Sequence, residues 1–275
     1  MPALINLVYL IPVSLFIVGL QRLSSPKTAS SGNLIAALGM GLGVLIALFA
    51  PMESGDDNYL IIIGALVFGG GIGLVVAGKV LMTKMPEMVS LFNGLGGACA
   101  LLISIAELLN FHGSGSFELA PYLTTLLALL IGSIAFTGSL VAYGKLSGNI
   151  KDSWKLPRAN MINMFLLLTL IAASVYQLQV LDTVDLVYII MILSLIYGIT
   201  FVLNVGGADM PVIISILNAL TGVSAALAGI IYDNMIMLMG GILVGSSGAI
   251  LTLLMCRAMN RSLLNVLAGG FGGTS

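Results

Sequence analysis

Charged residues are scarce in this chain of 275 residues, since Asp, Glu, Lys and Arg together make up 8% of it, whereas a soluble domain has about 25%. Hydrophobic residues make up 59%, and the mean hydropathy is +1.14. So few charges cannot cover the surface of a soluble fold of this size. The composition therefore excludes a cytosolic enzyme and a disordered chain. The net charge of −1 excludes a nucleic-acid binder, which needs a basic patch. An integral α-helical membrane protein remains.

Side chains for metal or nucleophilic chemistry are equally scarce. The two cysteines, Cys99 and Cys256, form no CxxC pair, so we expect no metal site and interpret both as small core residues. The single histidine, His112, follows an apolar segment in a Gly/Ser-rich stretch and is interpreted as a solvated residue of an external loop. The glycine-rich run at 69–73 lies inside an apolar segment with no strand before it, which indicates close helix packing rather than a nucleotide loop. No basic residue precedes the first apolar stretch, which argues against a cleaved signal peptide.

Long apolar stretches are abundant, and nine of them approach the roughly 20 residues that cross a bilayer as a helix. They cover residues 4–20, 34–50, 59–80, 88–108, 122–143, 161–177, 186–205, 211–231 and 235–255. We therefore predict an all-α, polytopic membrane protein with nine transmembrane helices in one domain over residues 1–275.

The basic residues predict the orientation of these spans. Taking alternate loops from the first span onward, all 10 Lys and Arg fall in one set of loops, which includes the loop between residues 144 and 160. The other set holds acidic residues only, among them Asp56, Asp182 and Asp233. The positive-inside rule then predicts an external N-terminus and a cytoplasmic C-terminus.

The fourth and eighth predicted spans begin alike, which suggests a parallel internal repeat. Residues 85–97 and 210–222 share Met, Pro, Ser, Asn, Leu and Gly at a constant offset of 125, although chance similarity between Leu/Ile/Gly-rich helices is the alternative. Each span carries a stripe of small and polar residues at helical spacing. The stripes include Asn93 on the fourth span and Asn218 and Thr221 on the eighth, and we expect them to face other helices or a wet path.

Each polar candidate has a structural and a functional interpretation. Asn93 and Asn218 either bond neighbouring helices together or hold water in an ion path. Ser139, taken alone, is expected to bond back to its own helix. Asp209 either caps the eighth helix, where a negative charge is favourable, or places a carboxylate at the mouth of a path. Glu107 is expected to reach the membrane interface.

Several motifs resemble the membrane part of the beta subunit of proton-translocating NAD(P) transhydrogenase. They are Gly-Gly-Ala-Asp-Met-Pro-Val at 206–212, Leu-Val-Gly-Ser-Ser-Gly-Ala-Ile-Leu at 243–251, Met-Cys-Arg-Ala-Met-Asn-Arg-Ser at 255–262, Phe-Thr-Gly-Ser at 136–139, Gly-Lys-Leu at 144–146 and Met-Pro-Glu-Met-Val at 85–89. The similarity extends over nearly the whole chain from the third predicted helix onward, and it is most specific around Asp209 and at 257–262.

The resemblance implies an activity that the composition does not show. The family couples hydride transfer from NADH to NADP to proton re-entry across a bacterial plasma membrane or a mitochondrial inner membrane, and we expect the former here. An alpha polypeptide carries the NAD(H)-binding domain and completing membrane helices, and the complexes are dimeric. An NADP(H)-binding domain normally follows the membrane part, about where this chain stops at residues 269–273. The chain is thus expected to be a lipid-embedded fragment that binds no cofactor itself, while NAD and NADP bind elsewhere in the complex.

By this resemblance the proton-path and coupling positions fall on Asn93, Ser139, Asp209 and Asn218, and the polar stripe adds Thr221. Many members carry histidine where this chain has Asn93, which cannot titrate near neutral pH. We therefore expect a partner chain to supply the main titrating group. An ion-coupled secondary transporter and a purely structural membrane anchor are the alternative functions.

Overall fold

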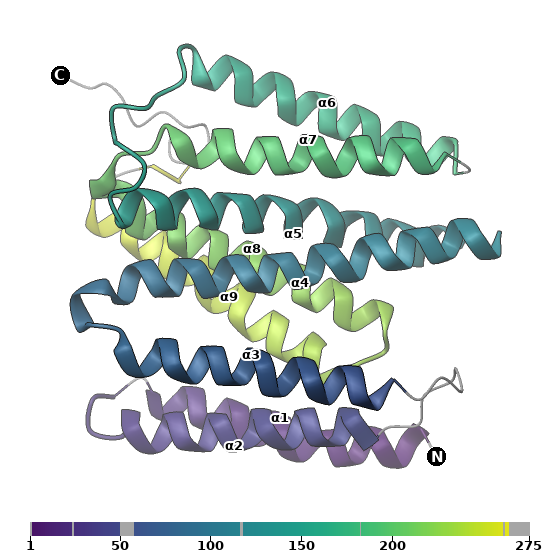
Figure 1. Cartoon of the computed structure of the whole chain (residues 1–275), viewed down its shortest axis with the longest axis vertical. Coiled ribbons are helices and arrows are strands. Elements are labelled where there is room, and N and C mark those ends of the chain that lie inside the picture. Colours follow the sequence, from purple (N-terminus) through teal and green to yellow (C-terminus); the bar gives the residue numbers. More distant parts are fainter. Residues whose placement is uncertain are drawn as a thin grey trace. The chain divides into compact units, whose positions relative to one another are not determined.

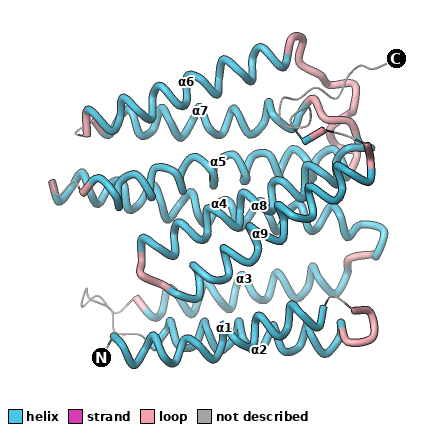
Figure 2. Tube along the Cα trace, turned by 180° about the vertical axis from the view of Figure 1, so that it is seen from behind, coloured by secondary structure: helices cyan, strands magenta, loops and turns pink. Residues whose placement is uncertain are grey.

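The structure is a computed structural model that describes residues 2–23, 25–49, 58–115, 118–181, 183–260 and 262–263. These residues form helices, turns and short irregular segments, and no strand occurs among them (Figures 1 and 2). The predicted all-α class is therefore confirmed. The chain divides into two compact units, Met1–Met82 and Thr83–Ser275, and each is described by itself.

Eight helices in the described residues are long and apolar enough to cross a membrane, so the chain is a multi-pass membrane protein. They are α2 (Ala29–Phe49), α3 (Tyr59–Lys79), α4 (Met85–Ser114), α5 (Leu119–Leu146), α6 (Ala159–Gln179), α7 (Val184–Leu203), α8 (Met210–Ile231) and α9 (Met235–Ala258). A further helix, α1 (Pro2–Leu23), precedes them, and its apolar part with described side chains, Val8–Leu23, is shorter than a span.

In the first unit, α1 and α2 pack closely through glycine. A Cβ atom added to Gly32 would lie 2.8 Å from the carbonyl oxygen of Gly19 on the facing helix, so the two backbones are nearly in contact. In contrast, α3 has no buried residue in the described structure. Its glycine-rich run at 69–73 meets no described atom within 4 Å, so close packing at that run stays a prediction.

In the second unit, α5 is the central helix, and it contacts α4, α7 and α8. It also has the largest buried share among the candidate spans. Helix α6 packs on α7, and α9 packs on α8 (Figure 1). Large apolar side chains such as Phe165 and Leu168 on α6 point outward, as expected for helices in contact with lipid.

The α4–α5 pair and the α8–α9 pair share two contacts at corresponding positions. Ser90 on α4 donates a hydrogen bond to the carbonyl of Ser139 on α5 at 2.9 Å, and Ser215 on α8 donates one to the carbonyl of Gly248 on α9 at 3.0 Å. Gly97 and Gly222 are also 125 residues apart. Gly97 lies against the backbone of α5, and Gly222 lies against the backbone of α9. The polar and small stripes predicted on these helices therefore face neighbouring helices.

The contact at Gly222 predicts a stability effect. A Cβ atom there would lie 2.3 Å from the backbone nitrogen of Gly245, and backbone cannot move aside as a flexible side chain can. We expect Gly222→Ala to lower the free energy of unfolding by about 1–3 kcal/mol, the usual cost of overpacking. Thermal unfolding of the purified chain in detergent measures it. Gly240→Ala on α9 is the control, because a Cβ at Gly240 meets no described atom within 4 Å, and an equal loss in both variants would contradict the argument.

Candidate functional site

A buried polar cluster joins α4 and α5 near the ends at which α4 begins and α5 finishes. The side-chain amide of Asn93, which is 8% exposed, donates a hydrogen bond to the hydroxyl of Ser139 at 3.0 Å. The carbonyl of Ser139 accepts the bond from Ser90. Ser139 thus receives bonds from a second helix at both oxygens, and the expectation that its hydroxyl bonds back to its own helix is wrong.

Helix α8 adds Thr221 to this cluster. The hydroxyl of Thr221 donates to the backbone carbonyl of Asn93 at 3.4 Å, and its methyl group faces Gly96 at the α4–α8 crossing. Asn218 lies one turn earlier on α8, so its depth is close to that of Asn93. The Asn218 side chain is half-buried and takes part in no hydrogen bond with the described residues.

This difference between the two asparagines has a simple cause. The carbonyl that accepts from Ser215 belongs to Gly248, whereas the carbonyl that accepts from Ser90 belongs to Ser139. Glycine has no hydroxyl that could accept a bond from Asn218 in the way that Ser139 accepts one from Asn93. The Asn218 amide is therefore left available to water or to a group from another chain.

Asp209 lies in the short turn that connects α7 to α8. It ends a 3₁₀ turn, η2 (Gly207–Asp209), and stands at the N-cap position of α8. Its side chain makes no capping bond and accepts no hydrogen bond from the other described residues, although Asp209 is only 7% exposed. Capping by the side chain, one of the two interpretations of Asp209, is therefore not observed.

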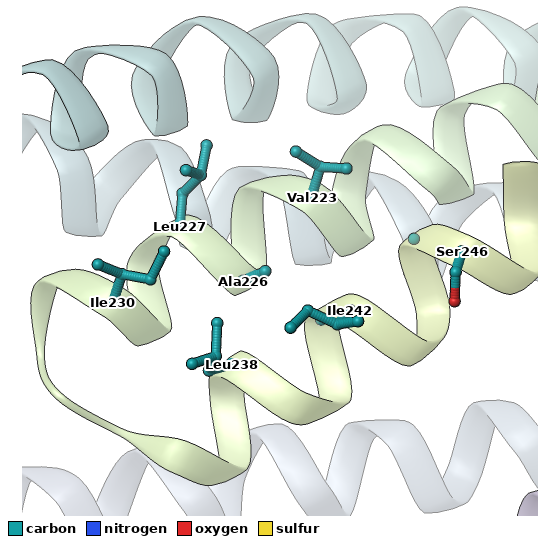
Figure 3. A pocket seen from close by; sticks show the side chains of 9 residues that line it. Val223, Ala226, Leu227, Ile230, Leu238, Ile242 and Ser246 are labelled. Atoms are coloured by element: carbon teal, nitrogen blue, oxygen red, sulfur yellow. The ribbon is translucent and has the colours of Figure 1, made fainter.

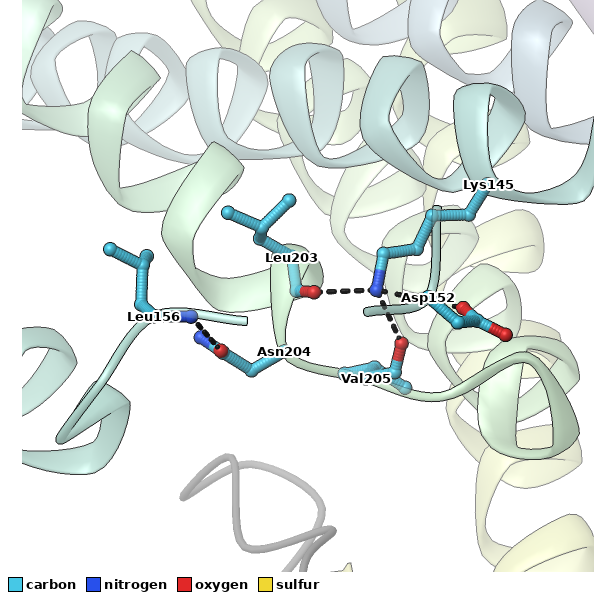
Figure 4. A network of polar contacts seen from close by, with 6 residues as sticks. All are labelled: Lys145, Asp152, Leu156, Leu203, Asn204 and Val205. Carbon is cyan, nitrogen blue, oxygen red and sulfur yellow. Dashed lines mark hydrogen bonds and ion pairs between the residues drawn. The ribbon is translucent and has the colours of Figure 1, made fainter. Parts of the chain in front are cut away.

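The turn before Asp209 is held by Lys145, in the last turn of α5 (Figure 4). The Lys145 ammonium donates to the carbonyls of Leu203 and Val205, the second at 2.7 Å, and lies 3.9 Å from the carboxylate of Asp152. Asn204, between the two carbonyls, accepts a bond from the backbone N–H of Leu156 at 2.7 Å. The sequence reasoning used Lys145 as a marker of topology and as part of the Gly-Lys-Leu motif at 144–146, and neither use predicted these contacts.

Comparison with known proteins shows the family to which the chain belongs. A sequence model described as NAD(P) transhydrogenase beta subunit matches residues 5–275. The chain belongs to this family. Two relatives, both named NAD(P) transhydrogenase subunit beta and both from Rhodospirillum rubrum, are 37% identical to it over 269 residues, which is 96% of this chain. The chain spans 57% of the length of these relatives.

In this member of the family, the single histidine is part of a helix. His112 lies in the last turn of α4 and is half-buried, with Nδ1 2.7 Å from the carbonyl of Leu108. Its ring lies 6.0 Å from that of Tyr122, which is fully buried and accepts a bond from Gln177. The prediction of a solvated loop residue is wrong, because α4 continues past its apolar stretch to Ser114.

Glu107 stands on α4 where α8 finishes. Its carboxylate accepts a hydrogen bond from the hydroxyl of Tyr232 at 3.4 Å. Partial burial and then the neighbouring carboxylate of Glu107 raise the pKa of Tyr232, so the phenol stays protonated and can donate. Glu107 therefore joins α4 to the α8–α9 turn, and whether it also reaches a membrane interface stays a prediction.

A cavity of about 360 Å³ lies between α8 and α9, away from the polar cluster (Figure 3). Its lining is apolar except for the hydroxyl of Ser246. Such a surface suits a lipid chain or apolar side chains rather than a nucleotide. Elsewhere in the described structure, no three His, Cys, Asp or Glu residues gather in a group that could hold a metal ion.

The structure also tests the expected burial of the two cysteines. Cys256 is buried as predicted, whereas Cys99 is exposed, because α4 turns that residue away from the helices it packs on. Asp56, Asp182 and the glycine-rich end at 269–273 lie outside the described residues.

Proposed function

We propose that this chain is the proton-translocating membrane part of an NAD(P) transhydrogenase, in which partner domains transfer hydride from NADH to NADP. The observation that carries the proposal is the contact of Asn93, Ser139 and Thr221 from three helices of a family member. Amide and hydroxyl groups buried among helices can hold and orient water, and a file of water can carry protons. Asn218 continues the cluster with a half-buried amide that takes part in no hydrogen bond with the described residues.

Asp209 places an ionisable group at the N-terminal end of α8. The same helix carries Asn218 and Thr221 of the polar cluster further along. The proposed NADP(H)-binding domain would follow this chain and dock on that face, beside the carboxylate of Asp209. No cofactor is proposed to bind the chain itself, because hydride transfer takes place between the domains that hold NAD and NADP.

The proposed partners are the parts of the complex that this chain lacks in the proposal, namely the nucleotide-binding domains and further membrane helices. An alpha subunit would contribute the NAD-binding domain and further membrane helices, and the complex would be a dimer in a bacterial plasma membrane. The half-buried amide of Asn218 supports a helix partner, since an amide left without a bond in lipid is costly. Helices with small and polar faces associate through such bonds.

The paired contacts of α4–α5 and α8–α9 support a parallel duplication within the membrane part. Ser90 and Ser215, and likewise Gly97 and Gly222, make equivalent contacts at the offset of 125. A two-fold axis along the membrane normal would relate the two pairs. The α8–α9 pair has Gly248 where the α4–α5 pair has Ser139. Asn218 therefore lacks the hydroxyl that Asn93 binds, and we propose that a partner chain binds Asn218 instead.

The orientation proposed for the chain, with nine spans and an external N-terminus, gives a direct labelling prediction. Ser153 is exposed in the loop between α5 and α6, where Lys151, Lys155 and Arg158 also lie. In a background without Cys99 and Cys256, Ser153→Cys should react with a membrane-impermeant maleimide in inverted vesicles and not in intact cells. Labelling in intact cells would reverse the orientation.

The transporter alternative is less well supported by the helices that carry the cluster. Secondary transporters commonly build a mid-membrane site from interrupted helices, whereas α4 and α8 run unbroken past Asn93 and Asn218. A structural anchor would have no need of three buried polar groups in mutual contact, which cost stability in an apolar setting.

Reconstitution of the whole complex tests the proposed function. The full-length beta subunit and its alpha partner are placed in vesicles with a pH-sensitive dye. We expect hydride transfer between NADH and NADP to be accompanied by proton movement that an uncoupler abolishes. Hydride transfer without proton movement would refute the proposal, and nucleotide-independent solute uptake would favour the transporter.

A further inference from the structure

Lys145 is one of two charged residues, with Asp209, that are buried in the described part of the chain. Its side chain is 1% exposed, while that of its partner Asp152 is 62% exposed. A buried ammonium needs acceptors for its three N–H donors. Two are used by the carbonyls of Leu203 and Val205, and the third side faces Asp152.

The carbonyls that Lys145 binds lie where α7 finishes, and a cation is favourable there because the last carbonyls of a helix carry partial negative charge. They also lie immediately before the turn that carries Asp209. Within that turn the backbone N–H of Asp209 donates to the carbonyl of Gly206 at 3.0 Å. Lys145 therefore adds two backbone contacts between α5 and this turn to the apolar packing of Val205 and Met210 with α5.

A second set of contacts fixes the same turn to the loop that follows α5. Asn204 binds the N–H of Leu156 through its side-chain oxygen and the carbonyl of Thr200 through its amide, at 2.7 and 3.2 Å. The carboxylate of Asp152 lies beside Gly207, 3.2 Å from where a Cβ atom would stand. Figure 4 shows these groups converging on the turn from both sides.

Helix α5 connects this network to the polar cluster. Lys145 follows Ser139 by six residues, which is about 9 Å along an α-helix. Both side chains are buried against other helices, so a shift of α5 at one of them displaces the other. A rigid helix with buried contacts at both points transmits such a displacement.

We infer that Lys145 is a positioning residue that holds the Asp209 turn against α5 and thereby links that turn to the Asn93–Ser139 contact. This inference rests on the proposed role of Asp209 in coupling. Asp152 lies 3.9 Å from the Lys145 ammonium and its side chain is 62% exposed, so solvent weakens this ion pair, and we expect the two carbonyl bonds to hold the turn without it.

The test uses a thiol reporter in the turn of the full-length beta subunit, assembled with its alpha partner. Gly206→Cys is suitable because a Cβ at Gly206 meets no described atom within 4 Å, and Cys99 and Cys256 are replaced first. We expect Lys145→Met to raise the maleimide labelling rate of this cysteine at least fivefold. We expect Lys145→Arg, which keeps a buried cation and N–H donors, to stay closer to the parent than the Met variant does.

Two further variants separate the role of Lys145 from general disturbance of the loop. Lys151→Met makes the same change at an exposed lysine, and Asp152→Asn removes only the surface charge. Both should stay within twofold of the parent labelling rate. Coupled turnover, measured without the reporter, should fall at least tenfold in Lys145→Met and by less than threefold in Asp152→Asn.

Unchanged labelling in Lys145→Met would overturn the inference, as would equal acceleration in Lys151→Met. If Lys145→Met yields no intact complex by gel filtration, Lys145→Gln is used under the same criteria, because it keeps two N–H donors on a shorter neutral side chain. Labelling does not depend on hydride transfer. A parent complex that fails to move protons would therefore refute the proposed function, while the labelling rates still decide the role of Lys145.

Discussion

Replacing Asp209 with asparagine is expected to lower proton-coupled hydride transfer at least tenfold while the membrane part stays folded. Asp209 is 7% exposed and accepts no hydrogen bond from the other described residues, and it stands at the N-terminus of α8, where a negative charge is favourable. Asparagine keeps the shape of the side chain and is also a good residue at a helix N-terminus. The melting temperature of the variant should therefore stay close to that of the parent, although its coupled activity is lost.

A loss of coupled activity without a loss of stability distinguishes a coupling role of Asp209 from a capping role. If Asp209 acted only as a helix cap, asparagine would serve nearly as well, and both quantities would stay unchanged. Asp185→Asn, at an exposed position in the first turn of α7, is the matched control and should stay within twofold in turnover. Full proton-coupled turnover in Asp209→Asn would reject the coupling role.

The polar cluster shows what sequence pattern can predict for a membrane protein. Asn93 and Thr221 stood out because polar side chains are rare in apolar spans, and their helical spacing predicted an inward face, whereas Ser139 was selected through the family resemblance. The structure brings these three together. Asn218 matched Asn93 by the same pattern, yet the two differ in their contacts, because the residue opposite each asparagine comes from another helix.

Lys145 shows what the pattern could not predict. In sequence it is one of several lysines near the polar loop at 145–158, and the positive-inside rule treats them all alike. Its bonds are to the backbone carbonyls of Leu203, the last residue of α7, and of Val205 just after it, 58 and 60 residues away, and carbonyls carry no sequence signal. Likewise, hydropathy marked where apolar segments stop but not where helices stop, so α4 was predicted too short and His112 was placed in a loop.

Replacing a membrane-embedded histidine of the alpha partner is expected to abolish proton coupling, although no histidine of this chain is essential. Proton transfer at neutral pH requires a group with a pKa near 7, which histidine supplies most readily. Asn93, Ser139 and Thr221 cannot titrate in this range. His112 lies 19 residues beyond Asn93 on α4, about 28 Å along the helix. The amide of Asn218, which takes part in no hydrogen bond with the described residues, is the contact that we expect the partner's histidine to use.

The measurement is proton pumping by the whole complex, with each intramembrane histidine of the partner changed to glutamine in turn. One replacement should lower coupled turnover at least a hundredfold. In this chain, His112→Gln should stay within twofold. Asn218→Ala should weaken coupling about tenfold, because it removes the expected partner of that histidine, whereas Asn93→Ala disturbs water held at Ser139. If every partner histidine proves dispensable while Asn93→Ala abolishes coupling, then the path is carried by this chain and its water alone.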